Sequence, residues 1–390
     1  MYIFLRIIYF DISVKKQLLK IFESRFGDPQ ILLRSPGRVN IIGEHTDYNH
    51  GLSLPFAIEQ SIYFVARKND QNMCTIYAAN RDEVLTQPIS SSSFSNEGWL
   101  RFFNNSLHVL PVLPCGIDIV FGGDLPSGAG ISSSSAITCG FIALVNHLFD
   151  FQLCDEEIIS LASQAENGIG LQGGQMDQTT IVKGRQDHAL LLDFLSKSMQ
   201  EINLDLGNHH FYIFDSGQKH NLVNTAYNTR RNTCESAIEK LKTEDPSIST
   251  FRNVKKEHLA SKSLSIIERN RCEHIVNEND RVLKTVSAFK EGNISDIGSL
   301  LFQSHSSLSD LYEVSTDEID YLISLCKSHS KILGARIMGG GFGGSTINLV
   351  NGLLTENEIC VLQQSYKNKT GLQLDVIKVT PSDGIRYELF

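Results

Sequence analysis

A glycine- and serine-rich segment between an expected strand and an expected helix most restricts how this chain can fold. Residues 117–121 alternate like a strand, residues 122–135 are rich in glycine and serine, and residues 136–149 form an apolar run of helical length. The central part, DLPSGAGISSSSA at 124–136, holds two glycines and five serines. Glycine permits left-handed turns, and a helix N-terminus presents oriented N–H donors. The segment therefore predicts a cradle for an anion such as phosphate, with hydroxyls able to bind magnesium.

Two common nucleotide-binding motifs do not fit this segment. No GK[ST] follows the glycines, so it is not a Walker A loop, and the glycine spacing does not match GxGxxG. A dinucleotide-dependent dehydrogenase is therefore excluded. Considered alone, a turn with serine N-caps at the start of a core helix explains the segment equally well.

The length of the chain indicates two domains. Its 390 residues exceed one ordinary core of about 100–150 residues, so two similar units with a cleft between them are expected. Residues 197–207 are polar and irregular, and residues 210–215 begin a new strand pattern. We place the boundary near residue 200, with an N-terminal domain at 1–200 and a C-terminal domain at 201–390.

Several segments have helical patterns. Residues 18–26 favour a helix, whereas the short apolar run 1–10 contains Arg6 and is interpreted as a ragged start, not a signal peptide. In the second half, two sets of apolar residues each share one helix face: Cys234, Ile238 and Leu241, and Val282, Val286 and Phe289. Gly292 is expected to cap the second of these helices.

The composition excludes several classes of partner. A net charge of −9 and a pI near 5.7 argue against a phosphate-backbone footprint, so no nucleic acid is expected to bind. No run approaches about 18 consecutive apolar residues, so no membrane span is expected. The eight cysteines are dispersed without CxxC pairs, which favours reduced thiols. We expect a cytoplasmic protein because the sequence shows no signal peptide or membrane span, and a monomer because no coiled-coil or interface pattern stands out.

Three longer motifs carry a family resemblance. PGRVNIIGEHTDYNHG at 36–51 closely resembles the galactokinase signature of the GHMP kinase superfamily. The phosphate loop PxGAGxSSSA of that superfamily is matched from Pro126 except at its last position, and its late glycine-rich motif is matched by GARIMGGGFGGS at 334–345. Shorter family-like segments are QMDQ at 175–178, SGQKHNL at 216–222, HIVNENDRV at 274–282 and SHSSLSDLYEVS at 304–315. The resemblance covers roughly residues 18–385.

This resemblance implies a fold and an activity. The family has two α+β domains, one similar to a domain of a small-subunit ribosomal protein and one similar to ferredoxin, with the active site in the cleft between them. It implies a magnesium-dependent kinase that transfers a phosphoryl group from ATP to the C1 hydroxyl of galactose. Phosphoryl transfer needs a positioned hydroxyl, a metal ion on the phosphates and positive charge near the migrating group.

The resemblance also assigns the catalytic residues. Asp177 matches the catalytic aspartate, which would accept the proton of the sugar hydroxyl and hold it in line with the γ-phosphate. Arg38 matches the active-site arginine, a permanent charge that can contact both Asp177 and the developing phosphate charge. An aspartate beside an arginine is a weak base, so orientation matters more than basicity.

By the same resemblance, the sugar would be held by five residues from both halves. Glu44 would take the outer C6 hydroxyl, Asp47 would take the C3 and C4 hydroxyls, and His45 would support nearby contacts. Gly174 matches a backbone sugar contact, and Tyr227 matches a tyrosine that reaches the sugar from the second domain. Structural roles for His45 and Tyr227 remain open from the sequence.

ATP and magnesium would be held mainly by the glycine- and serine-rich segment. The residues expected at ATP are Pro126, Gly128, Ala129, Gly130, Ser132, Ser133, Ser134 and Trp99. Ser134 and Glu166 are the expected magnesium ligands, since this hard cation prefers oxygen ligands. Trp99 and Phe102 lie where the family places aromatic residues beside adenine, although core packing explains them equally well. Residues 339–344 would let the second domain approach the phosphate loop closely.

Some positions depart from the family pattern. The segment between Glu166 and Asp177 is one residue shorter than usual, and Ser135, Met338 and Ser345 replace the usual alanine, threonine and cysteine. These changes leave open a related sugar such as arabinose, galacturonate or N-acetylgalactosamine, although Glu44 favours a neutral C6 hydroxyl over a carboxylate. A sugar sensor without catalysis is a further alternative, against which the presence of Arg38 and Asp177 argues.

Overall fold

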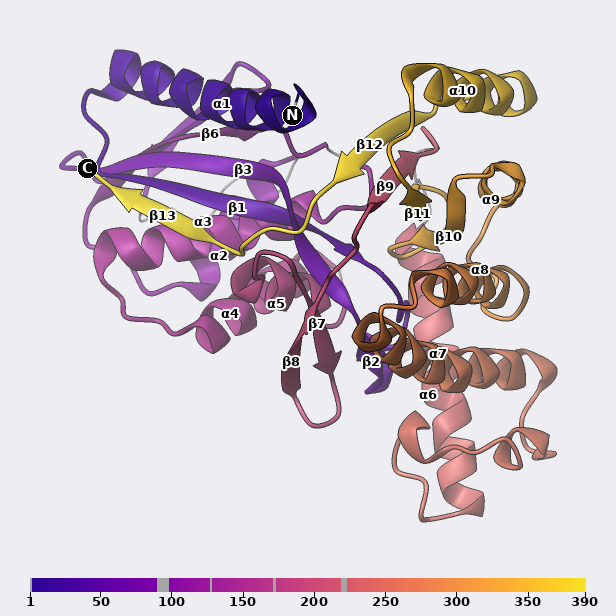
Figure 1. Ribbon diagram of the computed structural model, residues 1–390. Helices are drawn as coiled ribbons and strands as arrows, with labels where there is room; N and C mark the ends of the chain where they lie inside the picture. Colours follow the sequence, from indigo (N-terminus) through magenta and orange to yellow (C-terminus); the bar gives the residue numbers. More distant parts are fainter. Residues whose placement is uncertain (1, 90–97, 127, 171–172, 219–222) are drawn as a thin grey trace.

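The computed structural model describes residues 2–89, 98–126, 128–170, 173–218 and 223–390. Within them, three β-sheets are covered by helices, so the chain is a mixed α and β protein, as expected (Figure 1). No helix in these ranges is long and apolar enough to cross a membrane.

The first sheet has six strands in the order β13-β1-β3-β6-β4-β5. Its strands are β1 (Ile31–Asn40), β3 (Pro55–Asn69), β4 (Met73–Ala78), β5 (Glu83–Pro88), β6 (Gly116–Gly123) and β13 (Arg386–Leu389). All neighbours are antiparallel except β4 and β6. The strand expected at 117–121 is confirmed as β6.

Helices cover both faces of the first sheet. One face carries α2 (Leu100–Val109), α3 (Ser133–Phe149), α4 (Asp155–Gly168) and α5 (Met176–Lys183), and the other carries α1 (Tyr2–Phe26) (Figure 1). The α3 side holds a large apolar core that includes Phe64, Phe103 and Phe141. The expected helix at 136–149 is confirmed and begins three residues earlier, at the last three serines of the loop.

The start of the chain differs from expectation. Residues 1–10 were interpreted as a ragged start, but α1 is helical from Tyr2, which makes it 25 residues long. The segment contains no glycine or proline until Gly27, which has φ +84° and ends the helix. Leu18 and Phe22 are buried against the sheet and anchor the helix. The apolar run is therefore a continuation of the expected helix.

A small sheet of three strands has the order β2-β7-β8, with β2 (Leu52–Ser53), β7 (His188–Asp193) and β8 (Ser198–Asn203). Strand β8 lies within the segment 197–207 that was expected to be irregular, so that expectation was wrong. Five of the six residues of this edge strand are exposed and only Ile202 is buried, so its sequence lacks the apolar alternation that predicts a strand. Lys197, at φ +56°, turns the β7–β8 hairpin.

The second half contains a four-stranded antiparallel sheet in the order β10-β11-β9-β12. Its strands are β9 (His209–Asp215), β10 (Ile332–Met338), β11 (Ser345–Asn351) and β12 (Asp375–Val379). The helices are α6 (Val223–Glu244), α7 (Ile266–Glu291), α8 (Ile294–Asp310), α9 (Asp317–Ser328) and α10 (Glu356–Thr370). Both expected helical faces lie in α6 and α7, and Gly292 caps α7 at φ +71°, as expected.

The two halves share a core. Val39 and Phe56 of the first sheet pack in one cluster with Phe211 of β9 and Val282 of α7, and the rings of Phe56 and Phe211 lie 5.5 Å apart. The end of the chain also crosses back, because β13 pairs with β1 (Figure 1). The division near residue 200 therefore stays a prediction about domains.

Candidate active site

Three loops carry most of the expected site residues. The signature loop, residues 41–51, connects β1 to β2. The phosphate loop, residues 124–132, connects β6 to α3, and its Ser127 lies outside the described residues. The glycine-rich turn, residues 339–344, connects β10 to β11. Residues 219–222 of the SGQKHNL segment also lie outside the described residues.

Arg38 on β1 and Asp177 in the first turn of α5 form a two-bond ion pair. Arg38 Nε donates to Asp177 Oδ1 at 2.7 Å, and Nη2 donates to Oδ2 at 2.9 Å. The remaining nitrogen, Nη1, donates to the carbonyl of Gly130 in the phosphate loop at 2.8 Å. Burial alone would lower the pKa of Arg38, but the charge and hydrogen bonds of Asp177 raise it above its usual value. The two residues expected to be catalytic thus lie together against the phosphate loop.

Ser132 adds a third donor to the same carboxylate. Its hydroxyl donates to Asp177 Oδ2 at 2.5 Å. The residue has φ +59°, a left-handed conformation that is uncommon for residues other than glycine. Asp177 keeps 27% of its side chain exposed although it has three donors. This carboxylate is therefore fixed in orientation yet open to a ligand.

Asp47 and Gly174 form the next contact. The Gly174 N–H donates to Asp47 Oδ2 at 3.0 Å. A Cβ at position 174 would lie 2.3 Å from the same oxygen, so only glycine permits this approach. Burial raises the pKa of Asp47 to about 6. Both residues were expected at the sugar, and the fold brings them together.

Glu44 is bound from the second half of the chain. Its Oε1 accepts hydrogen bonds from Arg336 Nη1 and from the Gly339 N–H, each at 3.0 Å. Glu44 is 3% exposed and Arg336 is fully buried. Sequence reasoning missed Arg336, although it stands within the glycine-rich motif, because its partner lies 292 residues away.

His45 and Tyr227 meet in an aromatic cluster. The His45 ring lies 5.5 Å from the ring of Tyr227 on α6, and its Nδ1 contacts the Tyr48 hydroxyl at 2.7 Å. That hydroxyl in turn lies 3.0 Å from the hydroxyl of Tyr312. Burial lowers the pKa of His45 to about 3, so the imidazole is neutral, and its buried Nε2 has no hydrogen-bond partner among the described residues. Tyr48 and Tyr312 were not singled out from the sequence.

The phosphate loop enters α3 through left-handed residues. Gly128 and Gly130 have φ +89° and +69°, and α3 begins at Ser133. Ser345, at the end of the glycine-rich turn, donates its hydroxyl to the carbonyl of Ala129 at 2.8 Å. The expected ATP residues Pro126, Gly128, Ala129, Gly130, Ser132, Ser133 and Ser134 therefore form one loop and helix start that the glycine-rich turn contacts.

Glu166 and Ser134 were expected to bind magnesium, and the chemistry of Glu166 fits a cation. Its Oε2 accepts from Ser135 at 3.1 Å and from Gln178 at 2.8 Å, whereas its buried Oε1 has no hydrogen-bond partner in the part of the chain that the structure describes. Burial raises the pKa of Glu166 to about 7. In the described part of the chain, no three His, Cys, Asp or Glu residues cluster as metal ligands. One carboxylate, a serine and nucleotide phosphates together suffice for magnesium.

Trp99 and Phe102 lie at the start of α2. Trp99 is 9% exposed, packs against Phe103 and Phe121, and donates its indole N–H to Glu83 Oε2 at 2.6 Å. Phe102 is also largely buried. Core packing thus accounts for most of the Trp99 surface, and a contact with adenine stays a prediction.

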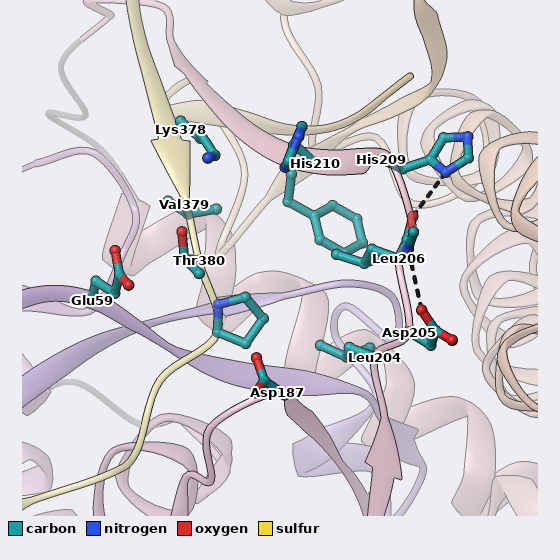
Figure 2. A pocket seen from close by; sticks show the side chains of 13 residues that line it. Glu59, Asp187, Leu204, Asp205, Leu206, His209, His210, Lys378, Val379 and Thr380 are labelled. Carbon is teal, nitrogen blue, oxygen red and sulfur yellow. Dashed lines mark hydrogen bonds between the residues drawn. The ribbon is translucent and has the colours of Figure 1, made fainter. Parts of the chain in front are cut away.

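Two hollows lie near the junction of the halves. The larger, about 970 Å³, is lined by Asp47 and Gly174 on one side and by Arg231 and Glu235 of α6 on the other. The smaller, about 310 Å³, is shown in Figure 2 and lies between Lys378 of β12, Glu59 of β3 and His210 and Phe211 of β9. None of the expected site residues is among the described residues that line the smaller one. The larger hollow is therefore the candidate entrance to the sugar site.

Three family models match the chain. The galactokinase galactose-binding signature matches residues 20–68, the GHMP kinases N terminal domain matches residues 98–185, and the GHMP kinases C terminal model matches residues 285–359. Each matched range contains one or more of the segments that build the site.

Curated relatives and solved structures agree with these matches. The chain is 36% identical over 370 residues to a galactokinase of Thermotoga maritima, covering 91% of this chain and 99% of the relative. It is 33% identical over 387 residues to a galactokinase of Bacillus subtilis, covering 96% and 99%. The Lactococcus lactis galactokinase structure complexed with galactose superposes with a TM-score of 0.88 at 27% identity, over 96% of this chain and 99% of that one. A Methanococcus jannaschii mevalonate kinase, at 18% identity and a TM-score of 0.66 over 92% and 100%, shares the fold.

Proposed function

The chain belongs to the galactokinase family of GHMP kinases, and on this premise we propose which of its residues carry the reaction. The reaction is the ATP-dependent phosphorylation of galactose. We assign the acceptor as the C1 hydroxyl, so that the products are galactose 1-phosphate and ADP. The observation that carries this assignment is the Arg38–Asp177 pair, whose third arginine nitrogen bonds the phosphate loop at Gly130.

Asp177 orients the attacking hydroxyl. Three donors already bind its carboxylate, which makes it an acceptor of fixed orientation. Its exposed part receives the proton of the C1 hydroxyl and holds that oxygen in line with the γ-phosphate. Arg38 fixes the carboxylate and places a permanent positive charge beside the migrating group.

The sugar is held by residues of both halves. Asp47 accepts the C3 and C4 hydroxyls, Glu44 accepts the C6 hydroxyl, and His45 supports these contacts. The Gly174 backbone and the Tyr227 hydroxyl close the site from α5 and α6. The hydrogen bond from Gly174 to Asp47 and the ring contact between His45 and Tyr227 support this grouping.

The phosphate loop binds ATP through its backbone N–H groups and the N-terminus of α3. Glu166 and Ser134 would hold magnesium, which neutralises charge on the phosphates when bound. The buried Oε1 of Glu166, which accepts no hydrogen bond from the described residues, supports this role. Trp99 would lie beside the adenine. We further propose that the protein acts as a monomer in the cytoplasm.

The regiochemistry of the product tests this assignment. Magnesium-ATP and galactose are incubated with the wild type, and the product is analysed by phosphorus NMR. The expected product is galactose 1-phosphate, and 1-deoxygalactose is expected to bind as a competitive inhibitor without reacting. A phosphate ester at another carbon, or turnover of 1-deoxygalactose at the rate of galactose, would overturn the assignment of C1.

A further inference from the structure

The signature loop and the strand ends beside it are held by four buried side chains of the second half. On α7, His274 Nε2 lies 3.2 Å from the Glu44 carbonyl, Glu278 Oε1 accepts from the Gly43 N–H at 3.0 Å, and Asn279 Oδ1 accepts from the Leu52 N–H at 2.8 Å. On β10, Arg336 provides the fourth contact. Residues of the HIVNENDRV segment and of the glycine-rich motif therefore both bond the signature loop and the strand ends beside it.

Arg336 makes the most extensive of these contacts. Its Nε donates to the carbonyl of Ile41 at 2.7 Å, and its Nη2 donates to the carbonyl of Asn40. Its Nη1 donates to Glu44 Oε1 at 3.0 Å and to its neighbour, the Ile337 carbonyl, at 2.6 Å. All three guanidinium nitrogens are therefore used, and three of the four bonds end on residues 40–44.

The carboxylate of Glu44 is held asymmetrically. Both of its described hydrogen bonds, from Arg336 and from the Gly339 N–H, end on Oε1. None of the hydrogen bonds among the described residues ends on Oε2. Glu44 is the one carboxylate within ion-pair distance of Arg336 in the described chain. The second half thus fixes one oxygen and leaves the other as an acceptor.

We propose that Arg336 is a positioning residue for sugar recognition, which acts by fixing the signature loop and aiming Glu44 Oε2 at the sugar. This inference rests on the proposed function, in which Glu44 accepts the C6 hydroxyl. Arg336 itself does not reach the sugar, because it is fully buried and four of its five N–H groups are already bonded to protein. The residue therefore affects which sugar is accepted, through Glu44.

A lysine cannot replace this arginine. Its single ammonium group has no planar fork, so it cannot reach two carbonyls and a carboxylate in the same geometry. In Arg336→Lys the backbone at residues 40–44 and the Glu44 carboxylate lose their common anchor. L-Arabinose has the same ring hydroxyls as galactose but lacks the C6 hydroxymethyl group, so it reports directly on the contact that Glu44 makes.

The test is a double-mutant cycle on sugar preference. The ratio of kcat/KM for galactose to kcat/KM for L-arabinose is measured for wild type, Arg336→Lys, Glu44→Gln and the double variant. We expect each single change to lower the ratio by about 10- to 100-fold, mainly through the KM for galactose. The double variant is expected to be no worse than the poorer single variant, because both remove the same contact. An unchanged ratio in Arg336→Lys, or fully additive effects, would overturn the inference.

Arg34→Lys is the matched control. Arg34 on β1 also donates to several carbonyls, those of Asp383, Ile58 and Glu59, but it does not contact the signature loop. Its change is expected to lower the melting temperature and leave the sugar ratio unaltered. If Arg336→Lys does not fold, Arg336→Gln, which keeps a neutral donor, is measured in the same way with the same expected fall in the ratio.

Failure of the proposed function and failure of the Arg336 inference give different experimental results. If the wild type does not phosphorylate galactose, the proposed function fails. If the wild type is active and Arg336→Lys lowers the melting temperature while the sugar ratio stays constant, Arg336 has a structural role only, and the positioning inference alone fails.

Discussion

The signature loop and the phosphate loop meet at one site but are held in different ways. Residues 41–46 of the signature loop are all buried and are bonded by three side chains of the second half, those of His274, Glu278 and Arg336. The phosphate loop is partly exposed over residues 124–126, and Gly128 has open space where a Cβ would stand. The fold therefore builds the sugar side in advance and leaves the backbone of the phosphate side free for a ligand.

This difference has a consequence for mutations. Changes to the side chains of α7 and β10 that bond the signature loop should alter sugar binding strongly, because buried charges and backbone bonds depend on them. The phosphate loop receives few side-chain bonds, those from Arg38 and Ser345 being the main ones. Nucleotide binding should therefore tolerate the same changes.

The largest expected effect is at the point where the two loops meet. Asp177→Asn keeps the shape of the side chain but removes the charge that pairs with Arg38, so the C1 hydroxyl loses its acceptor. We expect kcat to fall by about 1000-fold, as measured by ADP release, with nucleotide binding retained. Turnover within tenfold of the wild type would show that this carboxylate does not position the hydroxyl.

Glu278→Gln tests how strongly the second half holds the signature loop. The charges of Arg281, His274 and Arg336 hold the pKa of this buried carboxyl at about 2, although burial alone would raise it. Its loss leaves Arg281 without a charged partner, so we expect the free energy of unfolding to fall by about 3 kcal/mol. The KM for galactose should rise and the KM for ATP should stay near the wild-type value.

Glu268→Gln provides the comparison on the same helix. Glu268 pairs with Lys240, whose side chain is 42% exposed, and does not contact the signature loop. We expect a smaller loss of stability and no change in the KM for galactose. Equal effects of the two variants on that KM would contradict the distinction between the loops.

Asp47 makes stability depend on pH. Burial raises its pKa from 3.8 to about 6, so the folded protein binds this proton more tightly than the unfolded chain. Its contribution to stability is therefore full below pH 3.8 and declines as the pH rises to about 6. We expect Asp47→Asn to gain stability relative to wild type across this window, by at most about 1.4 kcal/mol per pH unit. Urea unfolding at several pH values measures the difference in free energy of unfolding between the two proteins. A difference that does not change with pH would contradict the prediction.

Ser345→Ala has the smallest expected effect. The change removes one hydrogen bond, to the Ala129 carbonyl, so stability should fall by about 1 kcal/mol and the KM for ATP should rise about fivefold or less. The KM for galactose should not change. Ser345→Cys, with a weaker donor, should lie between the wild type and the alanine variant. A larger rise in the KM for galactose than in the KM for ATP would contradict the assignment of Ser345 to the phosphate side.

Local patterns predicted the parts of the fold that local chemistry determines. The strand, loop and helix around residues 117–149 and the glycine cap of α7 follow from periodicity and backbone preference. Strand β8 was missed because its exposed residues are mostly polar, and the length of α1 was missed because the short apolar run 1–10 was interpreted as a ragged start. The family model matches bear out the kinase family that the motifs indicated.

The contacts between site residues were harder to predict from the sequence than the fold. The resemblance named Arg38, Asp177 and Glu44, but no local pattern connects Glu44 to Arg336 or Ser132 to Asp177. Such pairs form only when the fold brings together segments that are far apart in the chain. Tyr48 and Tyr312 were missed for the same reason, since their hydroxyls meet across 264 residues.

The rate of ADP release with a panel of sugars shows whether this chain is a kinase and whether galactose is its preferred substrate. Wild-type protein with magnesium-ATP is supplied with galactose, L-arabinose, N-acetylgalactosamine, galacturonate or glucose, and Asp177→Asn serves as the blank. Galactose is expected to give clearly the highest kcat/KM. Preference for another sugar would contradict the assignment of Glu44 and Asp47 to galactose, and no turnover with any sugar would contradict the kinase function itself.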